Sequence, residues 1–165
     1  MARTDDDAGA DSLPVGLVAT TIVVAILVAL VTLGIADALP AVELASVDRQ
    51  AGAAADDCRF LLSLAPRHLD DPGAPPGATR ILPFDLPEGT EYLSFGFDPD
   101  RGGGHEGAIY YKVRGSKKAL VVDERASFRA AEGDYLLLRS GSYHLQVEYV
   151  CDALGRRYLL VSGAQ

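Results

Sequence analysis

The segment DPDRGGGHE, residues 98–106, places oxygen-bearing side chains in a glycine-rich stretch. Asp98, Asp100 and Glu106 offer the carboxylate oxygens that Ca²⁺ or Mg²⁺ prefers, and glycines let a backbone fold around an ion. The spacing does not match a complete calcium loop, because its fifth position is Gly102 and no glutamate stands at the twelfth. We therefore interpret the segment as a hairpin connection with solvated acids. The three carboxylates remain a weak metal-site candidate.

Other residues that could do chemistry do not form a recognisable set. His68, His105 and His144 are scattered and lack the spacing of metal ligands. No serine stands in the strand-to-helix turn that exposes a catalytic nucleophile. We predict that the protein is not an enzyme and uses no cofactor.

The chain is acidic, with 15 Lys and Arg against 23 Asp and Glu and a net charge of −8. This balance argues against nucleic-acid binding, because neutralising phosphates requires clustered basic side chains. The lysine-poor, alanine- and aspartate-rich composition is typical of a salt-adapted archaeon or a GC-rich bacterium. In a halophilic protein the surface carboxylates hold water in concentrated salt. The acidity therefore indicates the solvent rather than a ligand.

The predicted helices and strands occupy different parts of the chain, and the strands lie in residues 79–165. The stretches with the period-2 alternation of half-buried strands are EYLSFGF, AIYYKVR and SYHLQVEYVC. With the neighbouring apolar runs they predict about seven short strands and an antiparallel sheet or sandwich. Residues 70–78, rich in proline and glycine, are predicted to form the loop before this β domain. The fold class is therefore expected to be α+β.

Residues 37–69 are predicted to form a helix next to the membrane. Small and apolar residues recur there in alternating steps of three and four, which is typical of a helix that packs along its length. We call these positions the packing seam: Leu44, Val47, Ala51, Ala54, Cys58, Leu61 and Ala65. The seam packs either on the protein's own β domain, which we favour, or on another subunit.

Residues 12–36 contain no charged side chain, and 14 of these 25 residues are Val, Ile or Leu. As a helix they reach about 37 Å, more than the roughly 30 Å hydrocarbon core of a bilayer. A cleaved secretion signal is the alternative, since Ala36-Asp37-Ala38 has the small-x-small pattern that signal peptidases recognise. However, residues 1–11 form an acidic tail and the apolar run exceeds a signal's core. We predict a transmembrane helix in contact with membrane lipid.

The two cysteines, Cys58 and Cys151, both follow the membrane segment. Cys58 lies on the packing seam and Cys151 on the apolar face of a predicted strand, so both sulfurs are expected in one core. A disulfide between them would close a loop of about 90 residues and stabilise the fold by about 4 kcal/mol. Two unrelated buried thiols are the alternative. Cysteines of this kind suit an oxidising exterior, so we predict a single-pass cell-membrane protein whose C-terminal domain is extracytoplasmic.

The stretch Ser12-Leu13-Pro14-Val15-Gly16-Leu17-Val18, followed by a Val/Ile/Ala-rich helix, resembles the opening of the hydrophobic segment in haloarchaeal type IV pilins and pilin-like small membrane proteins. The resemblance implies that residues 15–36 anchor the subunit and later take part in assembly. It also implies that the helix continues onto a β headgroup, and that the partners are like subunits or pilus-type assembly proteins.

The expected function is therefore a non-catalytic, membrane-anchored component of a type IV pilus-like surface appendage. The alternative is a tethered extracytoplasmic β-domain binding module that holds a ligand or a divalent cation. In that alternative the loop 98–106 would supply the site.

Overall fold

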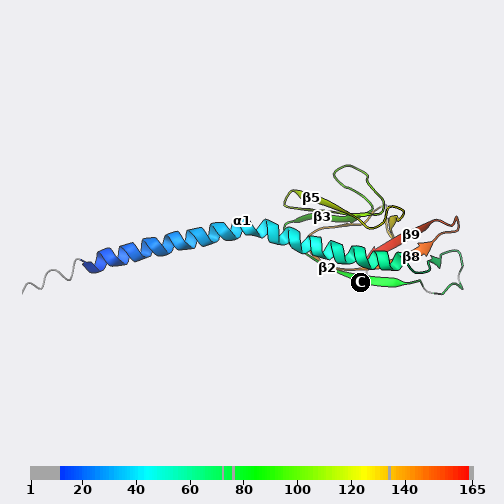
Figure 1. Ribbon diagram of the computed structural model, residues 1–165, viewed down its shortest axis with the longest axis horizontal. Coiled ribbons are helices and arrows are strands. Elements are labelled where there is room, and N and C mark those ends of the chain that lie inside the picture. The colour runs from blue at the N-terminus through cyan, green and yellow to red at the C-terminus, as the bar shows by residue number, and fades with distance from the viewer. Residues whose placement is uncertain (1–11, 72, 76, 134, 164–165) are drawn as a thin grey trace, which may run out of the picture. The chain divides into compact units, whose positions relative to one another are not determined.

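The computed structural model describes residues 12–71, 73–75, 77–133 and 135–163. One long apolar helix comes first, α1 (Ser12–Leu62), and a mixed domain with two β-sheets follows it (Figure 1). The strands in the described part of the chain are β1 (Arg67–His68), β2 (Thr79–Leu86), β3 (Thr90–Phe95), β4 (Ala108–Val113), β5 (Ser116–Val121), β6 (Phe128–Ala130), β7 (Leu137–Leu138), β8 (Gly141–Cys151) and β9 (Arg157–Gly163).

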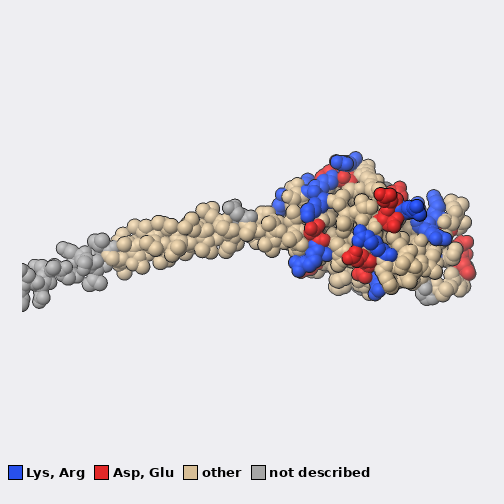
Figure 2. Space-filling view, viewed as in Figure 1, with Lys and Arg blue, Asp and Glu red and all other residues tan. Residues whose placement is uncertain are grey.

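The chain divides into two compact units between Leu39 and Pro40, inside α1. In the first unit every Val, Ile and Leu from Leu17 to Ile35 is 53–72% exposed. The few polar side chains there are satisfied locally: the Thr20 and Thr21 hydroxyls donate to the carbonyl oxygens of Gly16 and Leu17, each at 2.8 Å. The helix is long and apolar enough to cross a membrane. Figure 2 shows its uncharged surface, whereas acidic and basic side chains intermingle over the β domain.

The larger sheet is five-stranded and is organised around β8. One edge of β8 pairs with β9, which in turn pairs with β6. The other edge pairs first with β2 and then, where β2 ends, with the short strand β1. The smaller sheet has the order β5-β4-β3-β7, and all of its pairs are antiparallel.

The expectation of a wholly antiparallel domain was wrong for the larger sheet. Its strand pairs β1–β8 and β6–β9 are parallel, so this sheet is mixed. The parallel strands are only two and three residues long, RH and FRA. Strands this short contain too few residues for a period-2 pattern, so neither was visible in the sequence.

The helix also ends earlier than the predicted residue 69. Its last residue is Leu62, after which the amides of Ser63 and Leu64 donate to carbonyls three residues back. Pro66 then has no N–H to continue the helix. The next two residues form β1 and pair with β8, so strand pairing replaces helical hydrogen bonding at this point.

One main hydrophobic core joins the part of α1 after Pro40 to both sheets. Figure 1 shows this part of the helix running alongside the labelled strands of the domain. Phe95 lies within the core with its ring edge-to-face with Phe84 at 6.1 Å and with Phe128 at 5.3 Å. The core side chains from the strands include Leu82, Phe84, Leu93, Phe95, Ile109, Tyr111, Leu145, Val147, Leu159 and Val161.

An ion pair beside β1 ties the chain after the helix to the larger sheet. The Arg67 guanidinium donates to both Glu148 carboxylate oxygens, at 2.5 and 2.8 Å, and only 13% of the Glu148 side chain is exposed. This bidentate hydrogen bond lowers the pKa of Glu148 below the 4.5 that is usual for a glutamate. The stabilisation is therefore present above pH 4.5 and is lost as the pH falls through the folded-state pKa.

Replacing Glu148 with Gln is expected to lower the free energy of unfolding by about 1.5 kcal/mol at pH 7. Below the folded-state pKa the wild-type carboxyl is itself neutral, so the difference between the two proteins should shrink. Thermal melts of the full chain in detergent at pH 7 and in acid measure both effects. Glu132→Gln, at an exposed site, is the control. An effect of the same size at both pH values would contradict this account.

Candidate functional site

The packing seam lies largely inside the protein's own core. Val47, Ala51, Ala54, Cys58 and Leu61 are buried, and Leu44 packs against them from a half-buried position. Ala65 lies beyond the end of α1 and is exposed. Ala55, which was not counted as part of the seam, is also fully buried. The side of the helix that carries the seam therefore contacts the two sheets and is not free for another subunit.

Polar contacts on both sides of the seam hold this part of the helix on the sheets. Arg59 donates to the carbonyl oxygens of Val121 and Val122, each at 3.0 Å. On the other sheet, the Gln50 side chain donates to the Asp85 carbonyl oxygen at 2.9 Å and accepts from the Asp85 amide at 2.7 Å. These contacts involve backbone groups of the strands, so they set the position of the helix along each sheet.

Two acidic side chains of the helix face cations from the smaller sheet. Glu43 accepts from Arg114 at 2.6 and 3.1 Å. Asp48 accepts from the Tyr111 hydroxyl and from Lys118, and these hydrogen bonds lower the pKa of Asp48. Burial together with the Asp48 hydrogen bond raises the pKa of Tyr111. The charged residues that flank the seam thus pair within the domain.

The predicted disulfide between Cys58 and Cys151 is absent: both cysteines are buried and free. Cys58 belongs to the main hydrophobic core, where burial raises the pKa of its thiol to about 12. Cys151 is the last residue of β8, next to β1, and does not belong to that core; its sulfur lies 3.6 Å from the Asp152 carbonyl oxygen. The period-2 pattern placed Cys151 on the apolar face but could not show that the strand ends beyond the core.

The acidic loop after β3 does not bring its three carboxylates together. Asp98 is buried, and both of its oxygens accept from Lys117, at 2.6 and 2.7 Å. Asp100 lies 3.4 Å from the same ammonium and accepts from the Tyr92 hydroxyl at 3.1 Å. Glu106 instead lines a groove with aromatic residues. In the described residues no group of three or more His, Cys, Asp and Glu side chains could hold a metal ion.

The two lysines of the smaller sheet take the place that a cation would have in this cluster. The Asp98 hydrogen bond raises the pKa of Lys117, and the Glu91 hydrogen bond at 3.1 Å raises that of Lys112. Both ammonium groups therefore stay protonated and neutralise the acids of the loop. Because a bound cation would have to displace these lysines, the arrangement supports a structural ion-pair cluster rather than a cation site.

The three histidines are also separate in the structure. His68 lies in β1 and His144 in β8, both exposed. His105 lies in the loop before β4, where its Nδ1 accepts from the Gly107 amide at 3.0 Å and its own amide donates to the Tyr110 hydroxyl at 2.6 Å. These local hydrogen bonds hold the loop in place, so His105 has a structural role that needs no bound ligand.

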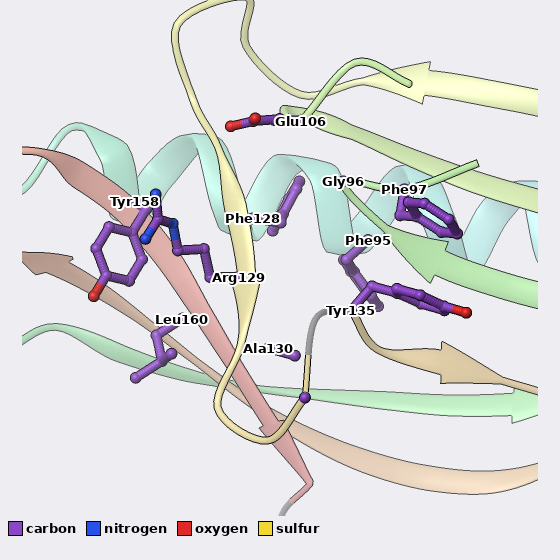
Figure 3. Close-up of a pocket in the computed structure, with 11 residues that line it drawn as sticks. Phe95, Gly96, Phe97, Glu106, Phe128, Arg129, Ala130, Tyr135, Tyr158 and Leu160 are labelled. Carbon is purple, nitrogen blue, oxygen red and sulfur yellow. The ribbon is translucent and has the colours of Figure 1, made fainter. Parts of the chain in front are cut away.

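A groove that the sequence did not indicate lies beside β6, the end of β3 and the first half of β9. Its first pocket has a volume of about 550 Å³ and is lined by Phe95, Gly96, Phe97, Glu106, Phe128, Arg129, Ala130, Gly133, Tyr135, Tyr158 and Leu160 (Figure 3). A second pocket of about 520 Å³ shares Glu106, Arg129 and Tyr158 with the first. The two pockets therefore adjoin each other at these three residues, and we call them together the groove.

Aromatic side chains define the two ends of the first pocket, as Figure 3 shows. At one end the rings of Phe97 and Tyr135 stack at 4.0 Å with an angle of 16°. At the other end the Arg129 guanidinium lies 4.7 Å from the centre of the Tyr158 ring. Gly96 lets the backbone at the end of β3 lie close to the backbone of Glu106. Its φ is +70°, and a Cβ there would lie 2.8 Å from the Glu106 carbonyl oxygen.

No protein-family model, curated protein or solved structure matches this chain. The function is therefore argued from the helix and the domain themselves.

Proposed function

We propose that this protein is a non-catalytic, single-pass membrane protein, a pilin-like or accessory component of a type IV pilus-like surface appendage. The observation that carries the proposal is the uncharged segment of α1 up to Ala36, in which every Val, Ile and Leu from Leu17 to Ile35 is 53–72% exposed. An 18-residue window of this helix has a mean hydropathy of 2.7, and none of the window is buried. In water so large an apolar surface would be unstable, whereas lipid or the apolar helices of like subunits would cover it.

The burial of the packing seam indicates that the two parts of α1 have different roles. Residues after Pro40 bury their apolar side in the core of the β domain. The Val, Ile and Leu side chains from Leu17 to Ile35 are all more than half exposed. The first segment is thus available for membrane lipid or assembly, and we propose that the two sheets enclose the second as a compact sandwich-like headgroup.

The proposed orientation has the N-terminus inside and the β domain extracytoplasmic. The absence of a disulfide removes one support for it. The support that remains is the distribution of positive charge, since the first basic residue after residue 36 is Arg49, 13 residues further on. Cytoplasmic flanks of a membrane helix normally carry more Lys and Arg close to the membrane.

The experiment is to express the full chain with a C-terminal tag, separate membranes from sheared surface filaments, and treat intact cells with protease. We expect carbonate-resistant membrane association, loss of the tag from intact cells on protease treatment, and the protein in the filament fraction. Tag protection in intact cells would overturn the orientation. Filaments that lack the protein, beside a monomeric membrane pool, would overturn the subunit role.

The alternative of a tethered binding module is favoured by one observation, the aromatic groove between β3, β6 and β9. The version of this alternative in which the module binds a divalent cation is not supported, because Lys117 already neutralises Asp98 and Asp100. A binding role would therefore depend on the groove and not on the acidic loop.

A further inference from the structure

Three arginines lie together along the groove: Arg125, Arg129 and Arg156. Arg125 and Arg129, which line it, have no carboxylate oxygen within 4.0 Å in the described part of the chain. Arg156 lies in the same pocket and is paired with Asp152 at 2.8 Å. Outside the groove, five of the eight described arginines contact a carboxylate, and Arg49, Arg139 and Arg157 do not. Two unpaired guanidinium groups in one groove therefore suggest that an external anion is their partner.

The groove also offers features that a simple anion does not need. Tyr135 is 43% exposed, and Phe97 stacks on one face of its ring. The face of an aromatic ring carries partial negative charge and attracts the weakly positive C–H groups on the flat side of a sugar ring. The carboxylates of Glu106 and Glu124 line the second pocket beside the arginines, where they can accept hydrogen bonds from hydroxyl groups.

We propose that this groove binds an acidic glycan, a polymer of sugar rings that carry carboxylate groups. The guanidinium groups of Arg125 and Arg129 bind the carboxylates, and the exposed face of Tyr135 stacks on a sugar ring. Glu106 and Glu124 accept hydrogen bonds from hydroxyl groups, which a sugar polymer has and a polyglutamate peptide lacks. Each pocket is within the roughly 300–1,000 Å³ of small-molecule sites, and two contiguous pockets suit neighbouring units of a polymer.

This inference concerns the β domain alone and does not depend on assembly into filaments. A protein that binds glycan but forms no filament would refute the subunit proposal only. A protein that forms filaments but binds no glycan would refute the groove proposal only.

The test uses the full chain in nanodiscs of phosphatidylcholine and measures binding by calorimetry. The probes are hexagalacturonate, the neutral sugar maltohexaose, and hexaglutamate. We expect hexagalacturonate to bind at least about tenfold more tightly than either of the others, as hydrogen bonds to charged groups allow. Equal binding of hexaglutamate would overturn the proposal in favour of an acidic peptide, and no binding of hexagalacturonate would overturn it outright.

Variants assign the binding to the groove. Arg129→Gln and Arg125→Gln are each expected to weaken hexagalacturonate binding by about tenfold. Arg125→Gln keeps the test valid if loss of the Arg129–Tyr158 contact unfolds the domain. The matched control is Arg139→Gln, an exposed arginine that lies outside both pockets. Equal losses in the control and the groove variants, or no loss in folded groove variants, would overturn the proposal.

Discussion

Replacing Val24 and Val28 together with Asp is expected to abolish stable membrane association of the full chain. Both side chains are more than half exposed, and both lie near the middle of the uncharged helix. A charged side chain at the centre of a membrane helix costs about 2.5–3.5 kcal/mol, so two cost about 6 kcal/mol. The measurement is the fraction of protein that remains in membranes after extraction with alkaline carbonate.

The matched control is the replacement of the same two residues with Leu, which preserves the apolar surface and should leave the membrane fraction unchanged. If the double Asp variant resists carbonate extraction as the wild type does, the helix is not held by lipid. Loss of both variants from the membrane would instead indicate a defect in expression. The contrast between the two pairs is thus the decisive result.

Replacing Ala51 with Leu is expected to destabilise the β domain by about 2 kcal/mol, because added side-chain volume in a packed core forces neighbours to move. Ala51 is fully buried between α1 and the sheets, in a run that includes Ala54, Ala55 and Cys58. These small side chains let the helix lie close to the strands. Thermal melts of the full chain in detergent should show a lower melting temperature by about 5–10 °C.

Ala53→Leu is the control for this variant. Ala53 is two residues away on the same helix but is exposed. The same chemical change there adds volume into solvent and is expected to shift the melting temperature little. Equal shifts at the two positions would mean that the seam is not closely packed, and a stabilised Ala51→Leu variant would mean that a cavity exists beside it.

Local patterns in the sequence were sufficient for the order of elements and for the faces that are apolar. The spacing of small residues predicted which side of the helix after Pro40 would be apolar, and Val47, Ala51 and Leu61 are buried there. The alternation in β8 likewise matches the burial of Leu145, Val147 and Tyr149. Period and hydrophobicity suffice for this, because they are properties of neighbouring residues.

The errors concern where elements end and which strands pair. The helix stops at Leu62, β1 and β6 pair in parallel, and Cys151 lies past the main core. Each depends on which segment supplies the next hydrogen bond at an element's end. That choice is made between strands far apart in the chain, such as β1 and β8, and leaves no mark in a short stretch of sequence.

The sequence by itself determined that this chain has an uncharged helix long enough for a membrane, followed by a strand-rich acidic domain. Only the tertiary structure decided the partners of the charged groups. Lys117 neutralises Asp98 from 19 residues away, and Arg59 reaches the carbonyl of Val122 from 63 residues away. It also determined that Glu106 lines a groove with Arg129 and Tyr158 and does not lie beside Asp98 and Asp100. The physical reason is that strand register and sheet packing, not sequence spacing, determine which distant side chains meet.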